Sequence, residues 1–327
     1  MPNTLLEKRK PLSGSLPFCT RAELQACWEL CRLHNNIGFW VVWLPTAWSI
    51  TMAYHAQQSI TIIDYFACLL KFFPLCYGIK SLIMTIDDIL DADVDGMVAR
   101  TKMRPIPRGD ISLARAWIFF GAQVIIGVPL ACVSLSSTSL IVCAIVCPLY
   151  VIYPTCKRWT NLAPIPLGIM FKIGIFIGWA ELANSQVGSK AVIPWHMLAP
   201  IYIGTCMWTI TYETVYQHQD KIDDVKIGLH SPALLLGHAT VPICTVTATA
   251  FFALLTYGGI MNTHGLFYFL GVGVAAIRLM SQLISVDVDK PESCRNFFLD
   301  TVRVGQIILG GIVVDTIYYR ISHGIPL

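Results

Sequence analysis

The sequence predicts an all-α integral membrane protein with nine transmembrane helices around a central cavity. Its 327 residues are 55% hydrophobic and only 13% charged, whereas charged residues make up about a quarter of a soluble domain. Apolar runs recur along the chain, each near the length that a helix needs to cross a bilayer. The runs lack the alternation of barrel strands, and backbone amides in lipid need internal partners, so helices are the expected spanning elements.

In chain order, the nine predicted spans are 39–55, 60–86, 113–133, 138–154, 164–183, 196–217, 240–261, 265–285 and 302–319. The loops between them are short and no flexible linker divides the chain. We therefore expect a cytosolic head over residues 1–36 and a single membrane-embedded domain over residues 37–327. The head is polar and holds no apolar core, so it predicts neither a cleaved signal peptide nor a typical transit peptide.

Basic residues predict the orientation. They gather in the head and in the loops after the second, fourth, sixth and eighth spans, whereas the opposite side has little beyond Lys190 and Arg320. The positive-inside rule then places the head and all charged loops in the cytosol. We expect a multi-pass protein of the endoplasmic reticulum or a related endomembrane, surrounded by lipid. Because topology accounts for the basic residues, no nucleic-acid partner is indicated, and no obligate protein partner is inferred.

The stretch DDILDADVDG, residues 87–96, follows directly on the second span. On a continuous helix Asp88, Asp91 and Asp95 would share one face, and Asp87 would lie one turn before Asp91. Asp93 would point elsewhere and be solvated. Like charges this close repel one another and resist losing water, so the cluster predicts a bound cation.

A second acidic stretch, QDKIDDVKIG, follows the sixth span. Its Asp220, Asp223 and Asp224 have helical spacing, and the parity of the spans puts them on the same side of the membrane as the first cluster. Two acidic faces are therefore expected to meet over the mouth of the cavity. Mg²⁺ suits such oxygens, since it commonly binds through carboxylates, waters and substrate phosphates. The simpler alternative is that both clusters are merely charged loop ends.

Basic side chains accompany the acids on the same side of the membrane. They are Arg100, Lys102, Arg104 and Arg108 after the first cluster, Lys157 and Arg158 after the fourth span, and Lys80 two turns before Asp88. Carboxylates, Mg²⁺ and basic groups together describe a site for a polyanion such as diphosphate. Lys80 has an alternative role, in which it reaches toward the membrane surface without binding substrate.

The sequence has no P-loop, no cysteine and histidine set with zinc spacing and no evident Ser/His/Asp arrangement. The remaining interpretation is a Mg²⁺-bound isoprenoid diphosphate whose leaving group is stabilised by metal and cations. The allylic carbocation formed on ionisation needs a dry cavity lined by aromatic rings. A membrane transporter is the alternative of another class, but it predicts acids near the bilayer midplane.

These residues resemble the UbiA-type intramembrane prenyltransferases, a family named for the 4-hydroxybenzoate polyprenyltransferases of quinone biosynthesis. The first family signature matches Asp87, Asp88, Asp91 and Asp95, followed by RTKMRP, and the second matches Tyr216, Asp220 and Asp224. YPTCKRWT resembles the loop between the two. Two departures are Asp87, where the family has Asn, and Asn36, where many relatives have Pro.

The resemblance implies a nine-helix bundle that releases diphosphate as it transfers a prenyl group, and it implies roles for single residues. The metal ligands would be Asp87, Asp88, Asp91, Asp95, Asp220 and Asp224, and the diphosphate ligands would be Lys80, Arg100, Lys102, Lys157 and Arg158. Arg158 could instead bind an acidic acceptor. Asp220 or Asp223 would remove the proton from the prenylated ring, with Arg158 beside them in the catalytic set.

The first motif is most similar in sequence to the fungal meroterpenoid branch of this family. That branch implies transfer of a farnesyl group from farnesyl diphosphate to a ring carbon of an orsellinic-type phenolic acid. Two alternatives keep the fold: a 4-hydroxybenzoate polyprenyltransferase of quinone biosynthesis, and a terpene cyclase that needs no acceptor.

Overall fold

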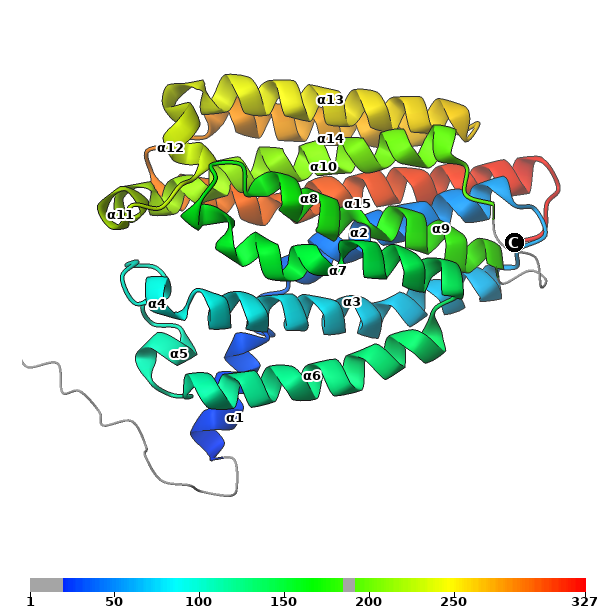
Figure 1. Ribbon diagram of the computed structural model, residues 1–327. Helices are drawn as coiled ribbons and strands as arrows, with labels where there is room; N and C mark the ends of the chain where they lie inside the picture. The colour runs from blue at the N-terminus through cyan, green and yellow to red at the C-terminus, as the bar shows by residue number, and fades with distance from the viewer. Residues whose placement is uncertain (1–19, 185–191) are drawn as a thin grey trace, which may run out of the picture.

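The chain forms a bundle of long helices that run along a common axis (Figure 1). A computed structural model describes residues 20–184 and 192–327, so the start of the predicted head and the loop with Lys190 lie outside the described residues. The helices are α1 (Arg21–Leu30), α2 (Ile37–Ala56), α3 (Ile62–Leu90), α4 (Ala92–Asp95), α5 (Pro105–Arg108), α6 (Leu113–Ser134), α7 (Ser137–Thr155), α8 (Pro164–Lys172), α9 (Gly174–Asn184), α10 (Trp195–Gln217), α11 (Lys221–Ile227), α12 (Pro232–Leu236), α13 (Thr240–Met261), α14 (Leu266–Ser285) and α15 (Pro291–Ser322).

The long helices coincide with the predicted spans, and local sequence explains where several of them begin. Thr61 caps α3 through a capping box with Asp64, which satisfies backbone donors that would otherwise lack partners. Ser112 and Ser136 cap α6 and α7 through their side chains. The fifth predicted span is divided at Ile173, where α8 ends and α9 begins at Gly174.

Seven helical segments of the described chain are long and apolar enough to cross a membrane, so the protein is a multi-pass membrane protein. The predicted count of nine is not confirmed. The spans predicted at α2 and α10 have the necessary length but are not among those seven. Most of their residues are buried by neighbouring helices, so these two helices do not need a lipid-compatible surface.

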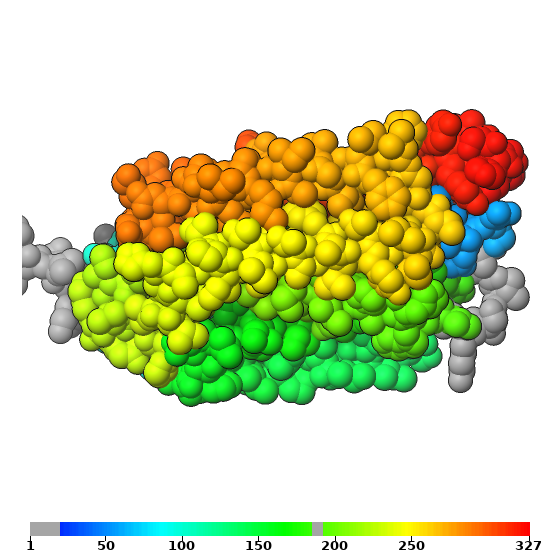
Figure 2. All heavy atoms as spheres, turned by 90° about the horizontal axis from the view of Figure 1, so that it is seen from above, coloured from blue at the N-terminus to red at the C-terminus, as the bar shows by residue number. Residues whose placement is uncertain are grey.

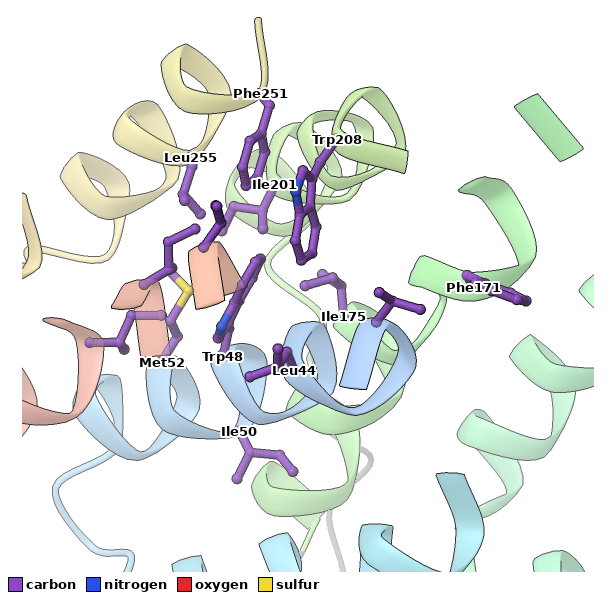
Figure 3. Packing of buried hydrophobic residues seen from close by; sticks show 14 of the residues in the cluster. Leu44, Trp48, Ile50, Met52, Phe171, Ile175, Ile201, Trp208, Phe251 and Leu255 are labelled. Carbon is purple, nitrogen blue, oxygen red and sulfur yellow. The ribbon is translucent and has the colours of Figure 1, made fainter. Parts of the chain in front are cut away.

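A stack of aromatic rings joins the inner helices (Figure 3). Trp48 of α2 lies on Trp208 of α10, and Trp208 lies nearly parallel to Phe251 of α13, with ring centroids 5.5 Å apart in both pairs. Trp48 also donates a hydrogen bond from Nε1 to the carbonyl of Gly305 in α15 at 3.1 Å. Each aromatic pair contributes about 0.5–1.5 kcal/mol beyond its buried area. The stack therefore fixes the helices that form the walls of the site.

Two helices cover one outer face of the bundle. α13 and α14 lie side by side there, above α10 and α15 (Figures 1 and 2). At the opposite face, α6 packs against α3, and α1 packs beneath them through a small cluster that includes Leu30, Ile89 and Ala116. The short helices α4, α5, α11 and α12 all lie at one end of the bundle (Figure 1), which is where the acidic motifs are.

Candidate active site

The first acidic motif lies where α3 ends. α3 ends at Leu90 and Asp91 caps it before the short helix α4, but helical hydrogen bonds continue through this point, from the Asp91 amide to the Asp87 carbonyl at 2.9 Å and from the Asp95 amide to the Asp91 carbonyl at 2.8 Å. Asp87, Asp91 and Asp95 follow one another at about one helical turn and line the wall of one cavity. Asp88 is not among the residues that line it. Its carboxylate accepts from Arg32 at 2.7 Å and lies 3.0 Å from Arg104 Nη1.

The second acidic motif lies beyond the end of α10. The chain passes through a 3₁₀ turn, His218–Asp220, into α11, which ends at Gly228 with a φ of 73°, a backbone conformation that glycine adopts without strain. Asp220 and Asp224 line the same cavity as the first motif. The two motifs therefore face one another, as expected from the parity of the spans.

Asp223 differs from its neighbours because it does not line the cavity. Its carboxylate accepts from the backbone amide of Ala99 at 2.9 Å and from Lys226 at 3.1 Å. Those two bonds hold its pKa below the usual range. Asp223 thus ties α11 to the loop after α4, and the structure gives no support for its predicted role as proton acceptor.

Basic side chains hold the two motifs in place across the cavity. Arg100 donates to both oxygens of Asp220, at 2.9 and 2.6 Å, and Lys157 Nζ lies 3.2 Å from Asp224. Arg104 contacts Asp95 at 2.6 Å. Such charge-assisted bonds, and the bidentate arginine above all, fix geometry as well as charge.

Three other predicted phosphate ligands have different surroundings. Lys80 lines the cavity, but its Nζ donates to the backbone carbonyls of Cys31 and Arg32, at 2.8 and 2.7 Å. Arg158 also lines the cavity and pairs with Asp93, whose side chain is 65% exposed. Lys102 is exposed and does not line the cavity. Their roles toward diphosphate stay predictions, and that of Lys102 has the least geometric support.

The cavity has a volume of about 180 Å³. Its polar mouth holds the two motifs, and its inner wall carries the rings of Tyr153, Phe171, Tyr212, Tyr216 and Phe298. Arg100 lies 5.5 Å from the centre of the Tyr216 ring. An anionic head and an apolar or aromatic body could therefore occupy the two parts of the site together.

Sequence reasoning missed several residues of this cavity. Arg32 and Asn35 come from the predicted head, and Glu213 comes from α10. Glu213 is 7% exposed, and it accepts a hydrogen bond from Gln217 at 3.4 Å. A signal for Glu213 was present, because it precedes Asp220 by two helical turns and so points to the same side. No pattern in the sequence marks Arg32 or Asn35.

Burial and mutual repulsion act on the acids of this cavity. Burial, together with repulsion from Asp87 and Asp95, raises the pKa of Asp91 to about 8, and burial raises the pKa of Asp95 and of Asp224. Oδ1 of Asp224 is buried without a hydrogen-bond partner among the described residues. Crowded carboxylate oxygens of this kind are the ligands that a hard divalent cation requires, so the residues present fit a Mg²⁺ site.

Another group of ligand-type residues lies near the opposite end of the bundle. His55, His264 and Asp315 are buried, with one potential ligand atom of each within 4.8 Å of the others. The two imidazole rings are tilted by 37° with centroids 4.1 Å apart, and both ring nitrogens of His264 already take part in hydrogen bonds, with Asn262 and Asp315. Asp315 accepts from His264 Nδ1 at 2.9 Å and from the amide of Gly265 at 2.8 Å. This arrangement caps the start of α14.

Fold and cavity together define a multi-pass helical membrane protein with a carboxylate-lined and arginine-lined site at one end of its bundle. Residues 42–304 match the UbiA prenyltransferase family. The chain is 34% identical to the mitochondrial 4-hydroxybenzoate polyprenyltransferase of Schizosaccharomyces pombe, over 88% of this chain and 78% of that protein. The protein belongs to the UbiA prenyltransferase family, and the prediction of a diphosphate-releasing prenyltransferase is confirmed at the level of that family.

Other relatives agree with this assignment. The protein of the same name from Aedes aegypti is 33% identical over 90% of this chain, which spans 64% of that relative's length. A UbiA homolog from Aeropyrum pernix K1 superposes with a TM-score of 0.66 at 24% identity, covering 84% of this chain and 97% of that one. A UbiA homolog from Archaeoglobus fulgidus, solved with GPP and Mg²⁺, gives 0.58 at 14% identity, covering 88% and 99%. These two structures support the fold.

Proposed function

We propose that the protein transfers a prenyl group from a Mg²⁺-bound prenyl diphosphate to a ring carbon of a phenolic aromatic acid. The observation that carries this proposal is the single cavity, which is lined by acids from both motifs together with Arg100 and Lys157. The Archaeoglobus fulgidus homolog is bound to GPP and Mg²⁺, which are a prenyl diphosphate and the proposed metal.

The acidic and the basic side chains at the mouth of the cavity have different roles in binding diphosphate. Asp87, Asp91, Asp95, Asp220 and Asp224 would hold Mg²⁺, directly or through water, and Asp88 would act by holding Arg32 and Arg104. When bound, Mg²⁺ neutralises the negative charge that develops on the departing diphosphate. Arg100, Lys157 and Arg104 stand beside these acids and would bind the phosphate oxygens.

The inner wall of the cavity suits the carbocation that departure of diphosphate creates. The faces of Tyr153, Tyr212 and Phe298 present negative electrostatic potential without a nucleophile that readily attacks carbon. Bonding of the acceptor ring carbon to the allylic carbon then leaves one proton to be removed from that ring carbon.

Glu213 is the group that we propose as the acceptor of this proton. It lines the cavity and forms no ion pair with the described residues, whereas Asp220 is already assigned to Mg²⁺ and paired with Arg100, and Asp223 lies outside the lining. A carboxylate in that position could also accept a hydrogen bond from the phenol of the acceptor. The alternatives Asp220 and Asp223 have less geometric support.

For the two substrates we propose farnesyl diphosphate and an orsellinic-type acid. The chain is 34%, 33% and 32% identical to the fission yeast, mosquito and human 4-hydroxybenzoate polyprenyltransferases. The choice of substrates rests on the resemblance of the first motif, DDILDADVDGMVARTKMRP, to the fungal meroterpenoid branch. This choice also carries the proposal of an endomembrane location.

The second candidate is polyprenyl transfer to 4-hydroxybenzoate in a mitochondrial membrane. It is favoured by the names of these same relatives, each of which is a mitochondrial 4-hydroxybenzoate polyprenyltransferase. The two candidates share the cavity and all the residue roles above, and differ in the substrates and the membrane.

The deciding experiment incubates purified membranes with Mg²⁺ and a panel of prenyl diphosphates and phenolic acids, and identifies products by mass spectrometry. We expect a farnesylated orsellinic-type acid and no product after chelation of Mg²⁺. Prenylated 4-hydroxybenzoate alone would establish the second candidate. A hydrocarbon released without any phenol would instead indicate a terpene cyclase and overturn the transfer reaction. A fluorescent fusion distinguishes endomembrane from mitochondrial location.

A further inference from the structure

A second hollow of the molecule lies on the outside of the bundle, between α14 and α15. It has a volume of about 570 Å³ and shares no lining residue with the acidic cavity. Arg278 and Gln282 of α14 and Asn296, Asp300 and Arg303 of α15 form its polar wall. None of these residues has a role in the proposed prenyl transfer, so the polar character of the groove has a separate cause.

Asp300 organises the charge in this groove. Arg278 donates to both of its oxygens at 2.6 Å, Arg303 Nη1 donates to Oδ1 at 2.7 Å, and Gln282 donates as well. Two guanidinium groups therefore share one carboxylate, which leaves a net charge of about +1. The Arg303 side chain is 70% exposed, and its bond to Asp300 uses one of its five N–H donors. The groove can accept an anion.

The surroundings of the groove are apolar and face outward. Val274, Ile277 and Ile284 of α14 are 53%, 73% and 84% exposed, and Leu299 of α15 is 41% exposed. In a membrane protein such residues lie against acyl chains. A cationic groove bordered by them offers both surfaces that a phospholipid requires.

The level of the groove along the bundle agrees with this occupant. Arg303 stands at the start of the apolar part of α15, residues 302–319, on the same end of the bundle as the acidic motifs. An apolar helical segment of that length spans about 27 Å, which is close to the thickness of the hydrocarbon core of a bilayer. Its ends, and therefore Arg303, lie at the level of the lipid headgroups. Basic pockets between transmembrane helices at this level bind anionic headgroups.

We propose that the groove between α14 and α15 binds the phosphate of an anionic phospholipid in the leaflet on the active-site side, with its acyl chains against α14. The proposal does not depend on the identity of the prenyl substrates. α15 carries Leu299 and Asp300 in the groove and the adjacent Phe298 in the acidic cavity. A bound lipid would therefore steady one wall of the active site.

The test measures lipid binding to the full-length, detergent-purified protein by native mass spectrometry and by thermal unfolding. Phosphatidylglycerol should bind and raise Tm, whereas phosphatidylcholine and inorganic phosphate should not. Arg303→Gln should weaken phosphatidylglycerol binding about fivefold, the effect of one arginine near the surface, and Arg303→Lys should restore most of it. Arg303→Gln leaves the bidentate Arg278–Asp300 pair in place, so the variant is expected to fold.

The matched control is Arg295→Gln, which removes an exposed arginine of the same helix outside the groove. It should leave phosphatidylglycerol binding unchanged. The proposal would be overturned if both lipids bound equally well or if Arg303→Gln bound phosphatidylglycerol with unchanged affinity. It would also be overturned if Arg295→Gln lost as much affinity as Arg303→Gln. Stabilisation by inorganic phosphate alone would overturn the assignment to a lipid.

Discussion

Arg100 and Asp220 are joined by two parallel hydrogen bonds, Nε to Oδ1 at 2.9 Å and Nη2 to Oδ2 at 2.6 Å, although 120 positions separate them in the chain. Arg100 belongs to the loop that follows the first acidic motif, and Asp220 belongs to the second motif. The pair therefore closes the mouth of the cavity by connecting its two halves. Both side chains also line the site that we assign to diphosphate and Mg²⁺.

Removing one carboxylate from either motif should abolish most activity. We expect Asp91→Ala and Asp224→Ala each to lower turnover by at least about a hundredfold, the scale of losing one electrostatic stabiliser of a transition state. Steady-state assays with the natural diphosphate and acceptor measure this effect. Near-normal turnover in either variant would contradict the metal assignment.

Asp93→Asn is the matched control for these two variants. Asp93 belongs to the same run of acids, but its side chain is 65% exposed and pairs with Arg158 outside the metal cluster. Its loss should change turnover less than about threefold, since exposed ion pairs contribute only about 0–1 kcal/mol. A large loss here would indicate that the whole acidic run acts through its charge, with no defined ligand set.

Replacing the guanidinium of Arg100 should weaken substrate binding more than chemistry. Arg100→Lys keeps the charge but cannot form the two parallel bonds to Asp220. We expect KM for the prenyl diphosphate to rise about tenfold, because a hydrogen bond to a charged group contributes about 1.5–3 kcal/mol. Arg108→Lys is the control, since Arg108 pairs with Glu29 and Asp110 and does not line the cavity. Equal effects of both variants would argue against a specific role for Arg100.

The two acidic motifs show which features of the site follow from the sequence and which depend on tertiary contacts. Charge and span parity were enough to predict that both motifs meet in one cavity, because these depend only on composition and on which ends of the helices share a side. Helical spacing also placed Asp88 near Asp95, and both contact Nη1 of Arg104, although Asp88 does not line the cavity. Spacing alone could not show that Asp88 would be engaged by Arg32 of the head, because that contact depends on how the head packs on α3.

The contacts that could not be predicted come from tertiary structure. Lys80 had the right charge and position for a phosphate ligand, but its Nζ is bound to two backbone carbonyls of the segment before α2. Arg32 reaches the first motif from that same segment. Both facts depend on how the head packs on α3, which the sequence alone does not specify.

Glu213→Gln should separate proton transfer from binding. The amide is nearly isosteric with the acid but cannot take a proton, so kcat should fall by about 10²–10⁴, as for loss of a general base. Binding of the prenyl diphosphate, measured separately by calorimetry with Mg²⁺, should change little, because the acids of both motifs remain. If Asp223→Asn lowered kcat and Glu213→Gln did not, the role would return to Asp223.

Packing between α2 and α9 depends on the absence of a side chain at Gly178. A Cβ there would lie 2.7 Å from the carbonyl oxygen of Thr46 and 3.1 Å from Ile50 Cγ1, and a backbone atom cannot move aside cheaply. Gly178→Ala should therefore destabilise the bundle by about 1–3 kcal/mol, the range for overpacking, visible as a lower Tm in detergent. Gly273→Ala in α14, where a Cβ would meet nothing within 4 Å, should be neutral or slightly stabilising. Close helix contact through small residues is how helices associate within membranes, so an unchanged Tm in Gly178→Ala would mean that α2 and α9 are less tightly packed than these contacts indicate.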